Sequence, residues 1–128
     1  MITLNDIANE IRKIGLDPIE ESDNSVSLIY EMTLVVCYYD PEDMTVTLGV
    51  TNEVDTSGKR KEHELELIQE LNQWANIGKC FLFNDQYLMT VYQARVWNRD
   101  ILADIIKDGL KCISAMCDMH LRMSIDFS

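Results

Sequence analysis

The sequence predicts an α+β fold in which helices pack on an antiparallel sheet and the chain ends in a long helix. Several segments alternate apolar and polar side chains, which is typical of half-buried strands, whereas residues 102–121 repeat apolar side chains at helical spacing. Turn residues separate these segments. The 128 residues, 47% of them hydrophobic, fit a single domain over 1–128 with one core. The predicted order is helix, three strands, helix, two strands, helix.

The first predicted helix begins near Thr3 and Asp6, whose side chains can accept hydrogen bonds from free backbone N–H groups. Gly15 follows as a left-handed stop. The residues between them repeat at helical spacing and form one apolar face: Ile7, Ala8, Ile11 and Ile14. A short extended piece is expected around residues 18–21 before the first strand.

Residues 26–32 and 33–40 read as the first two strands. Residues 40–43 form a turn, because Asp40 suits its first position and Pro41 presets the φ angle of the second. The third strand alternates between two sets, Val46, Leu48 and Val50 against Thr45, Thr47, Gly49 and Thr51. The second strand is apolar on both faces, so one face must be covered by the last helix, a second copy or a partner peptide.

The polar residues 52–63 are predicted to be the only long loop and the most mobile segment. A helix over 64–77 follows, and Gly78 is expected to close it. Its core stripe is predicted to hold Leu65, Ile68, Leu71 and Ala75, with Leu67 and Trp74 at the edge. Strands over 80–83 and 87–97 form a hairpin, and Asn98 can cap the last helix.

The net charge of −11 is unevenly distributed. Residues 1–57 hold twelve acidic residues and two basic ones, a net of −10, whereas residues 58–128 hold ten and nine, a net of −1. Such an acidic field repels phosphate and anionic lipid, so we expect neither nucleic-acid nor membrane partners, although solubility alone also explains the charge. The first residues lack the features of a signal peptide, and a cytoplasmic protein is expected.

No motif predicts catalysis, a cofactor or a metal. His63-Glu64 begins like a zinc-protease motif, but Leu67 stands where the second histidine is required. His120 falls on the apolar stripe of the last helix and is expected at the edge of the core. The cysteines are expected to be reduced core residues rather than nucleophiles: Cys37, Cys80, Cys112 and Cys117. We therefore expect a protein that is not an enzyme, with no catalytic, cofactor-binding or metal residues.

A local pattern supports a family resemblance. Leu71-Asn72-x-Trp74-x-Asn76 precedes Gly78-Lys79-x-Phe81, and with the order of elements it resembles the YbjN family, which shares its fold with class I type III secretion chaperones. Here Ala75 separates the tryptophan from the asparagine, where the family has them adjacent. The resemblance implies a bacterial, noncatalytic protein. It implies regulation on the YbjN side, and an acidic dimer that wraps an extended effector segment on the chaperone side.

Two functions are compatible with the sequence. The first is a noncatalytic interaction module, regulatory or chaperone-like, that binds a protein or peptide through apolar sheet or helix surface and forms a homodimer. Its aromatic anchors are expected among Tyr38, Tyr39, Trp74, Tyr92 and Trp97, because large rings contribute most to desolvated contacts. The second is a small enzyme or ligand-binding protein. A deep polar pocket that sets a histidine against a cysteine would favour it.

Overall fold

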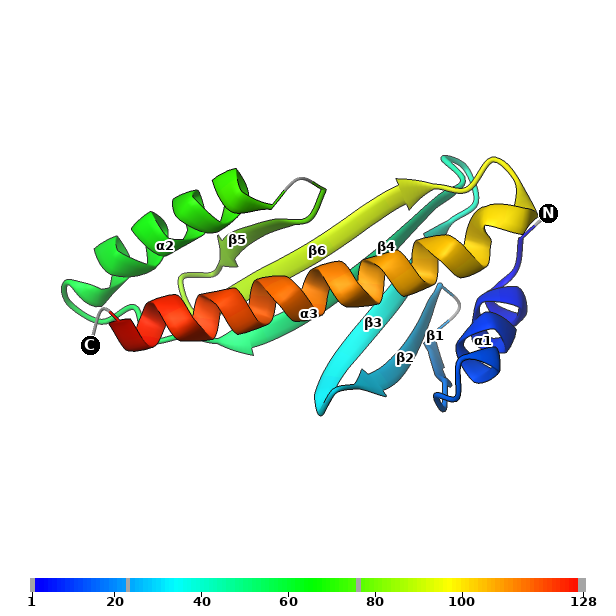
Figure 1. Cartoon of the computed structure of the whole chain (residues 1–128), viewed down its shortest axis with the longest axis horizontal. Coiled ribbons are helices and arrows are strands. Elements are labelled where there is room, and N and C mark those ends of the chain that lie inside the picture. Colours follow the sequence, from blue (N-terminus) through cyan, green and yellow to red (C-terminus); the bar gives the residue numbers. More distant parts are fainter. Residues whose placement is uncertain (1, 23, 76, 127–128) are drawn as a thin grey trace.

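The computed structural model describes residues 2–22, 24–75 and 77–126. Over these residues the chain forms a six-stranded antiparallel sheet, in the order β1-β2-β3-β4-β6-β5, and three α-helices (Figure 1). The helices are α1 (Leu4–Lys13), α2 (Arg60–Trp74) and α3 (Leu102–Asp126), and the strands are β1 (Ile19–Ser22), β2 (Ser25–Tyr30), β3 (Thr33–Asp40), β4 (Thr45–Glu53), β5 (Lys79–Phe83) and β6 (Tyr87–Arg95). The predicted fold class is confirmed. The extended piece expected near residues 18–21 pairs as the short edge strand β1.

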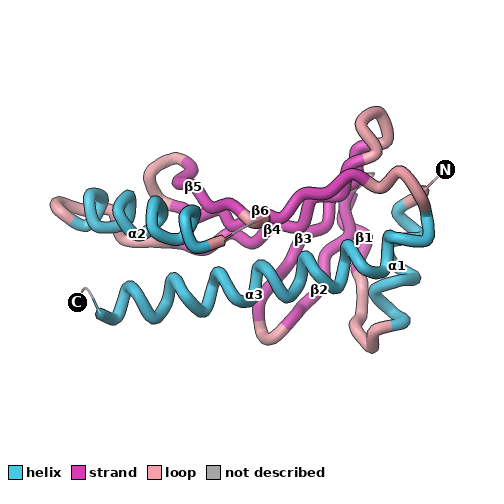
Figure 2. The backbone as a smooth tube through the Cα atoms, turned by 45° about the horizontal axis from the view of Figure 1, so that its top comes forward, coloured by secondary structure: helices cyan, strands magenta, loops and turns pink. Residues whose placement is uncertain are grey.

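The three helices lie on the same face of the sheet (Figures 1 and 2). α3 runs along the sheet, α1 packs beside it over β1 and β2, and α2 packs against β5 and α3. The larger core cluster joins α1 and α3 to β2, β3 and β4, and includes Ile106, which is 1% exposed. A second cluster lies under α2 and includes Leu71, also 1% exposed.

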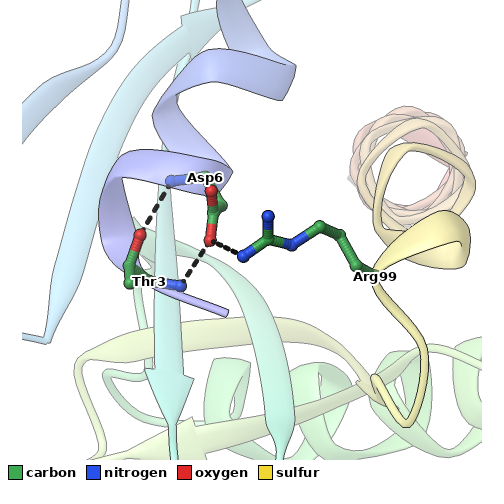
Figure 3. Close-up of polar contacts among 3 residues, drawn as sticks. All are labelled: Thr3, Asp6 and Arg99. Atoms are coloured by element: carbon green, nitrogen blue, oxygen red, sulfur yellow. Dashed lines mark hydrogen bonds and ion pairs between the residues drawn. The ribbon is translucent and has the colours of Figure 1, made fainter. Parts of the chain in front are cut away.

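The start of α1 has the predicted cap. Thr3 Oγ1 accepts from Asp6 N at 3.2 Å, and Asp6 Oδ2 accepts from Thr3 N at 2.8 Å (Figure 3). The hydrogen bonds with Thr3 lower the pKa of Asp6, and the nearby Arg99 guanidinium, 3.0 Å away, adds to that effect. The cap therefore also links α1 to the segment that leads into α3. At the other end of α1, Gly15 has the predicted left-handed conformation, with φ of +87°.

The second helix differs from its predicted span. It begins at Arg60 and ends at Trp74, so the loop before it is shorter than expected, and Gly78 does not close it. Gly78 is instead buried directly before β5. A Cβ there would lie 2.5 Å from Met116 Sδ and 2.7 Å from Cys112 Sγ. The glycine is required because the chain passes close to α3, and not because a helix ends there.

Two strands end earlier than predicted. The predicted strand over 26–32 stops at Tyr30, because Glu31 and Met32 take positive φ angles of 49° and 67° as the two-residue turn of the β2–β3 hairpin. The last predicted strand stops at Arg95. Asn98 then caps the 3-10 turn η1 (Arg99–Ile101), in which its Oδ1 accepts from Asp100 N at 3.0 Å, and α3 follows directly.

Candidate interaction surface

The sheet face opposite the helices carries several exposed apolar side chains, and we call it the open face. On β3, Val35, Cys37 and Tyr39 are buried toward the helices, so the alternate side chains point the other way. The cross-strand register carries this face across the sheet. Its large apolar side chains are 45–60% exposed: Ile19, Ile29, Leu34, Tyr38, Phe81 and Phe83.

The middle of the open face is formed by small side chains of β4. These are Thr45, Thr47, Gly49 and Thr51. Gln93 Nε2 donates to Thr47 Oγ1 at 3.1 Å, and the hydroxyl of Thr51 donates to Met89 Sδ at 3.0 Å, so polar groups here bond to their neighbours. The larger apolar side chains flank this central strand on both sides. The result is a broad surface on which another backbone could approach closely.

The predicted aromatic anchors separate into two groups. Tyr38 is 51% exposed on the open face, Trp74 is 51% exposed at the end of α2, and Trp97 is 71% exposed after β6. These three come from different parts of the fold. Tyr39 and Tyr92 are only 8% and 6% exposed, because their rings fill the core beneath the helices.

Sequence reasoning missed several exposed apolar side chains. On the open face these are Ile19, Ile29, Leu34, Phe81 and Phe83, and on the helix side they include Leu65, Leu121 and Ile125. The open-face side chains could have been found from the sequence, because their strands carry apolar side chains on both faces. Leu65 was expected in the core stripe and is 48% exposed, whereas Leu67, expected at its edge, is 2% exposed.

Asn72, from the family-like motif, closes one edge of the sheet. Its Oδ1 accepts from Cys80 N at 2.8 Å, and its Nδ2 donates to Cys80 O at 3.0 Å. The amide side chain of α2 thus pairs with the edge strand β5 as a neighbouring strand would. Exposed edge groups invite pairing with other chains, so this contact protects the edge as well as positioning α2.

Replacing Asn72 with alanine is expected to cost about 1–3 kcal/mol of unfolding free energy, because two part-buried backbone groups lose their partners. Asn72→Asp should also destabilise, since a carboxylate cannot donate to the Cys80 carbonyl. Urea denaturation measures both variants. Gln73→Ala, at the exposed neighbouring position, is the control. Equal stabilities of Asn72→Ala and Gln73→Ala would contradict this role.

A polar depression of about 410 Å³ lies between the loop before α2 and the end of α3. It is lined by Asp55, Ser57, Lys59, Arg60, His63, Glu64, Leu67 and Ser124. Its charges pair with protein groups: Arg60 Nε lies 3.4 Å from Asp55 Oδ2, and Glu64 Oε2 lies 2.9 Å from Nε2 of His120, the predicted core-edge histidine. Among the described lining residues there is no cysteine. The histidine–cysteine pocket that would favour an enzyme is therefore not found in this depression.

The cysteine thiols are poor nucleophiles at neutral pH. Burial raises the pKa of Cys37 to about 12 and that of Cys80 to about 11. Burial also raises the pKa of Cys112 and of Cys117. Since the thiolate is the reactive form, these environments favour packing over chemistry.

Among the residues that the structure describes, no group of three or more histidine, cysteine, aspartate or glutamate side chains is arranged to hold a metal ion. No helix in the described part of the chain is long and apolar enough to cross a membrane.

Comparison with solved structures shows the fold. The Escherichia coli protein YbjN, described as a candidate transcription regulator, superposes with a TM-score of 0.70 over 90% of this chain and 88% of its own, at 14% identity. The chain has a YbjN-like fold. The Yersinia pestis type III secretion chaperone SycH, solved with a fragment of YscM2, gives a TM-score of 0.59 at 13% identity, covering 93% of this chain and 97% of its own.

An uncharacterised protein from Methanothermobacter thermautotrophicus gives a TM-score of 0.66 at 11% identity, covering 99% of this chain and 100% of its own. No protein-family model matches the sequence, and no curated protein matches it. The predicted likeness to the fold of YbjN and of the secretion chaperones is confirmed. At these identities the likeness concerns the fold alone.

Proposed function

We propose that this chain is a noncatalytic protein-interaction module, regulatory or chaperone-like, that binds a protein or peptide partner and acts as a homodimer in the bacterial cytoplasm. The open face is the observation that supports this most strongly. Six large apolar side chains there are about half exposed. Soluble monomers rarely expose contiguous apolar patches larger than a few hundred Å², and larger patches mark interaction sites.

The comparisons support a binding role. YbjN carries the description of a candidate transcription regulator, and SycH was solved with a fragment of another protein. A role without catalysis is supported by the raised thiol pKa values and by the ion pairs of the polar depression. The same fold can serve different functions, so the exposed side chains of this chain, more than its fold, support a binding role.

The three exposed aromatic anchors lie on different parts of the surface. Tyr38 belongs to the open face, whereas Trp97 borders a depression of about 340 Å³ with Met44 and Pro41 at the end of the sheet. Trp74 is exposed on α2. Rings of this kind supply large contact area at low cost in rotamer entropy, so they are suited to anchor a partner.

Affinity capture tests this function. The immobilised wild type is expected to retain a defined protein from bacterial lysate, and Trp97→Ala should retain less of it because a large exposed anchor is lost. Analytical ultracentrifugation should show a wild-type dimer. Urea denaturation of Trp97→Ala provides the control, since an exposed ring contributes little to folding. A strict monomer at high concentration that captures nothing would contradict the proposal.

A further inference from the structure

We propose that α2 is a lid that opens while the rest of the fold stays intact, and that the strand edge it uncovers binds an extended segment of a partner protein. The inference rests on the proposed function and adds a covered binding site to the open face. α2 packs on β5 and α3, at the end of the molecule away from α1 (Figure 1). Its sequence, its packing and its hydrogen bonds each favour opening.

The start of α2 is poorly suited to a helix. Lys59 occupies the N-cap and makes no side-chain cap hydrogen bond among the described residues, whereas Thr3 caps α1. Arg60 and Lys61 follow in the first turn, where positive charge opposes the helix dipole. The N-terminal turn of α2 is therefore much weaker than that of α1.

The acidic side chains of α2 also disfavour the helix. Glu62, Glu66 and Glu70 are exposed and follow each other at four-residue spacing, so like charges adjoin on one face. The last turn of α2 holds no basic residue that would offset the dipole. Helical structure here therefore depends on packing against the rest of the protein.

The packing that holds α2 is small. Three of its fifteen residues are buried: Leu67, Ile68 and Leu71. Ile68 and Leu71 belong to the smaller core cluster, whose buried residues are separate from those of the larger cluster. α2 can therefore leave the sheet without exposing the larger cluster, as expected of a unit that opens by itself.

The ion pairs of α2 add limited support. Glu64 Oε2 lies 2.9 Å from Nε2 of His120 and joins the helix to α3. Two further pairs at the start of α2 are exposed, Arg60 with Asp55 and Lys61 with Asp85. Exposed ion pairs contribute little to stability, so these two do not hold the lid closed.

The surface under α2 is able to repack on another chain. On α3 it is formed by sulfur-containing side chains that recur on one helix face: Cys112, Met116, Met119 and Met123. Methionine is unbranched and polarisable, so its side chain adapts to neighbours of different shape. Apolar side chains of a partner could therefore replace those of α2 on this surface.

The hydrogen bonds of Asn72 identify the form of the partner. Asn72 pairs with both backbone groups of Cys80, at 2.8 and 3.0 Å. Cys80 thus directs these groups away from β6, and Leu82, two residues further along β5, has the same orientation. When α2 leaves, β5 becomes an open strand edge. An extended segment pairs with such an edge as an added strand, and its alternate side chains would take the places of Ile68 and Leu71.

Thiol labelling measures the opening, because each core cluster contains a buried cysteine. Cys80 lies under α2 and is 3% exposed, and Cys37 lies in the larger cluster and is 0% exposed. A maleimide added to the native full chain should modify Cys80 about tenfold or more faster than Cys37. Low concentrations of urea should raise the Cys37 rate steeply and the Cys80 rate little, because release of one helix exposes less surface than global unfolding.

Two variants separate local from global opening. Ile106→Val weakens the larger cluster, so it should raise the labelling rate of Cys37 about fivefold and leave that of Cys80 unchanged. Asn72→Ala should raise the Cys80 rate about fivefold or more, because the closed lid loses two hydrogen bonds. Gln73→Ala, at the exposed neighbouring position, is the matched control and should leave it unchanged.

A peptide probe tests the strand site. The probe is a fluorescein-labelled peptide with the sequence of β6, which pairs with β5 as a strand in the fold. Its apparent Kd, measured by fluorescence anisotropy, should fall in Asn72→Ala by the same factor by which Cys80 labelling rises, because only the open form binds. The same peptide with N-methylated backbone amides cannot donate strand hydrogen bonds and should not bind.

The outcomes separate this inference from the proposed function. Equal urea dependence of Cys80 and Cys37 labelling would mean that α2 opens only when the whole fold unfolds, which overturns the inference and leaves binding through the open face and Trp97 standing. A peptide Kd that is unchanged in Asn72→Ala, or equal binding of the N-methylated peptide, would overturn the strand site. A wild type that is a strict monomer and captures nothing would overturn the proposed function, and the partner site with it, even where α2 opens locally.

Discussion

Replacing Ile106 or Leu71 with alanine is expected to lower the unfolding free energy by about 2–5 kcal/mol, because each change removes buried methyl groups and leaves a cavity. Both side chains are 1% exposed. Ile106 belongs to the cluster between α3 and the sheet, and Leu71 to the cluster under α2. The two variants therefore test the two parts of the core separately.

Urea denaturation measures both changes, and the chain offers matched controls. Leu65→Ala removes the same groups from a side chain of α2 that is 48% exposed, and Ile125→Ala does so on α3, where the side chain is 64% exposed. The controls should cost much less, since surface substitutions usually change stability by under about 0.5 kcal/mol. Effects that small at both Leu71 and Ile106 would mean that the helix faces are assigned wrongly.

Local chemistry explains why the element order could be predicted. Thr3 and Asp6 satisfy free N–H groups at a helix start, and Gly15 adopts a conformation that other residues avoid. At the turn before β4, Asp40 Oδ1 accepts from the N–H of Glu42 at 2.9 Å. Each signal involves residues close in sequence, so no knowledge of the rest of the fold was needed.

The face of α2 could not be predicted in the same way. Leu65, Leu67 and Ile68 cannot all point to the core, and the sequence gives more than one apolar stripe. In the structure, the hydrogen bonds between Asn72 and Cys80 set the rotation of the helix against β5, and Leu67 and Ile68 are the buried side chains. The deciding contact joins residues of different elements and leaves only an ambiguous pattern in the sequence.

The sequence predicted that an apolar surface of the sheet takes part in binding, but it did not predict which side chains lie on that surface. β3 is apolar on both faces, so alternation could not decide whether Tyr38 or Tyr39 meets the helices. The register with β4 decides it. Tyr39 pairs with the buried Val46, and Tyr38 pairs with Thr47 on the open face.

Replacing Gly109 with leucine is expected to cost about 3 kcal/mol, at the upper end of the usual cost of overpacking a core. α3 crosses the sheet here at close range. A Cβ at this position would lie 2.8 Å from Tyr92 Cδ1 and 3.0 Å from Leu48 Cδ2. Both neighbours are buried, so they cannot move away without disturbing the packing of β4 and β6.

A graded series makes this prediction specific. Gly109→Ala should be less harmful than leucine, because alanine adds one carbon and gains about 1 kcal/mol of helix propensity over glycine. Lys107→Leu introduces the same leucine at an exposed position of α3 and controls for its effect on the helix itself. Urea denaturation compares the three. If Gly109→Leu were as stable as Lys107→Leu, α3 could not lie as close to Tyr92 and Leu48 as the structure places it, because the added side chain would need space that the closely packed interface does not contain.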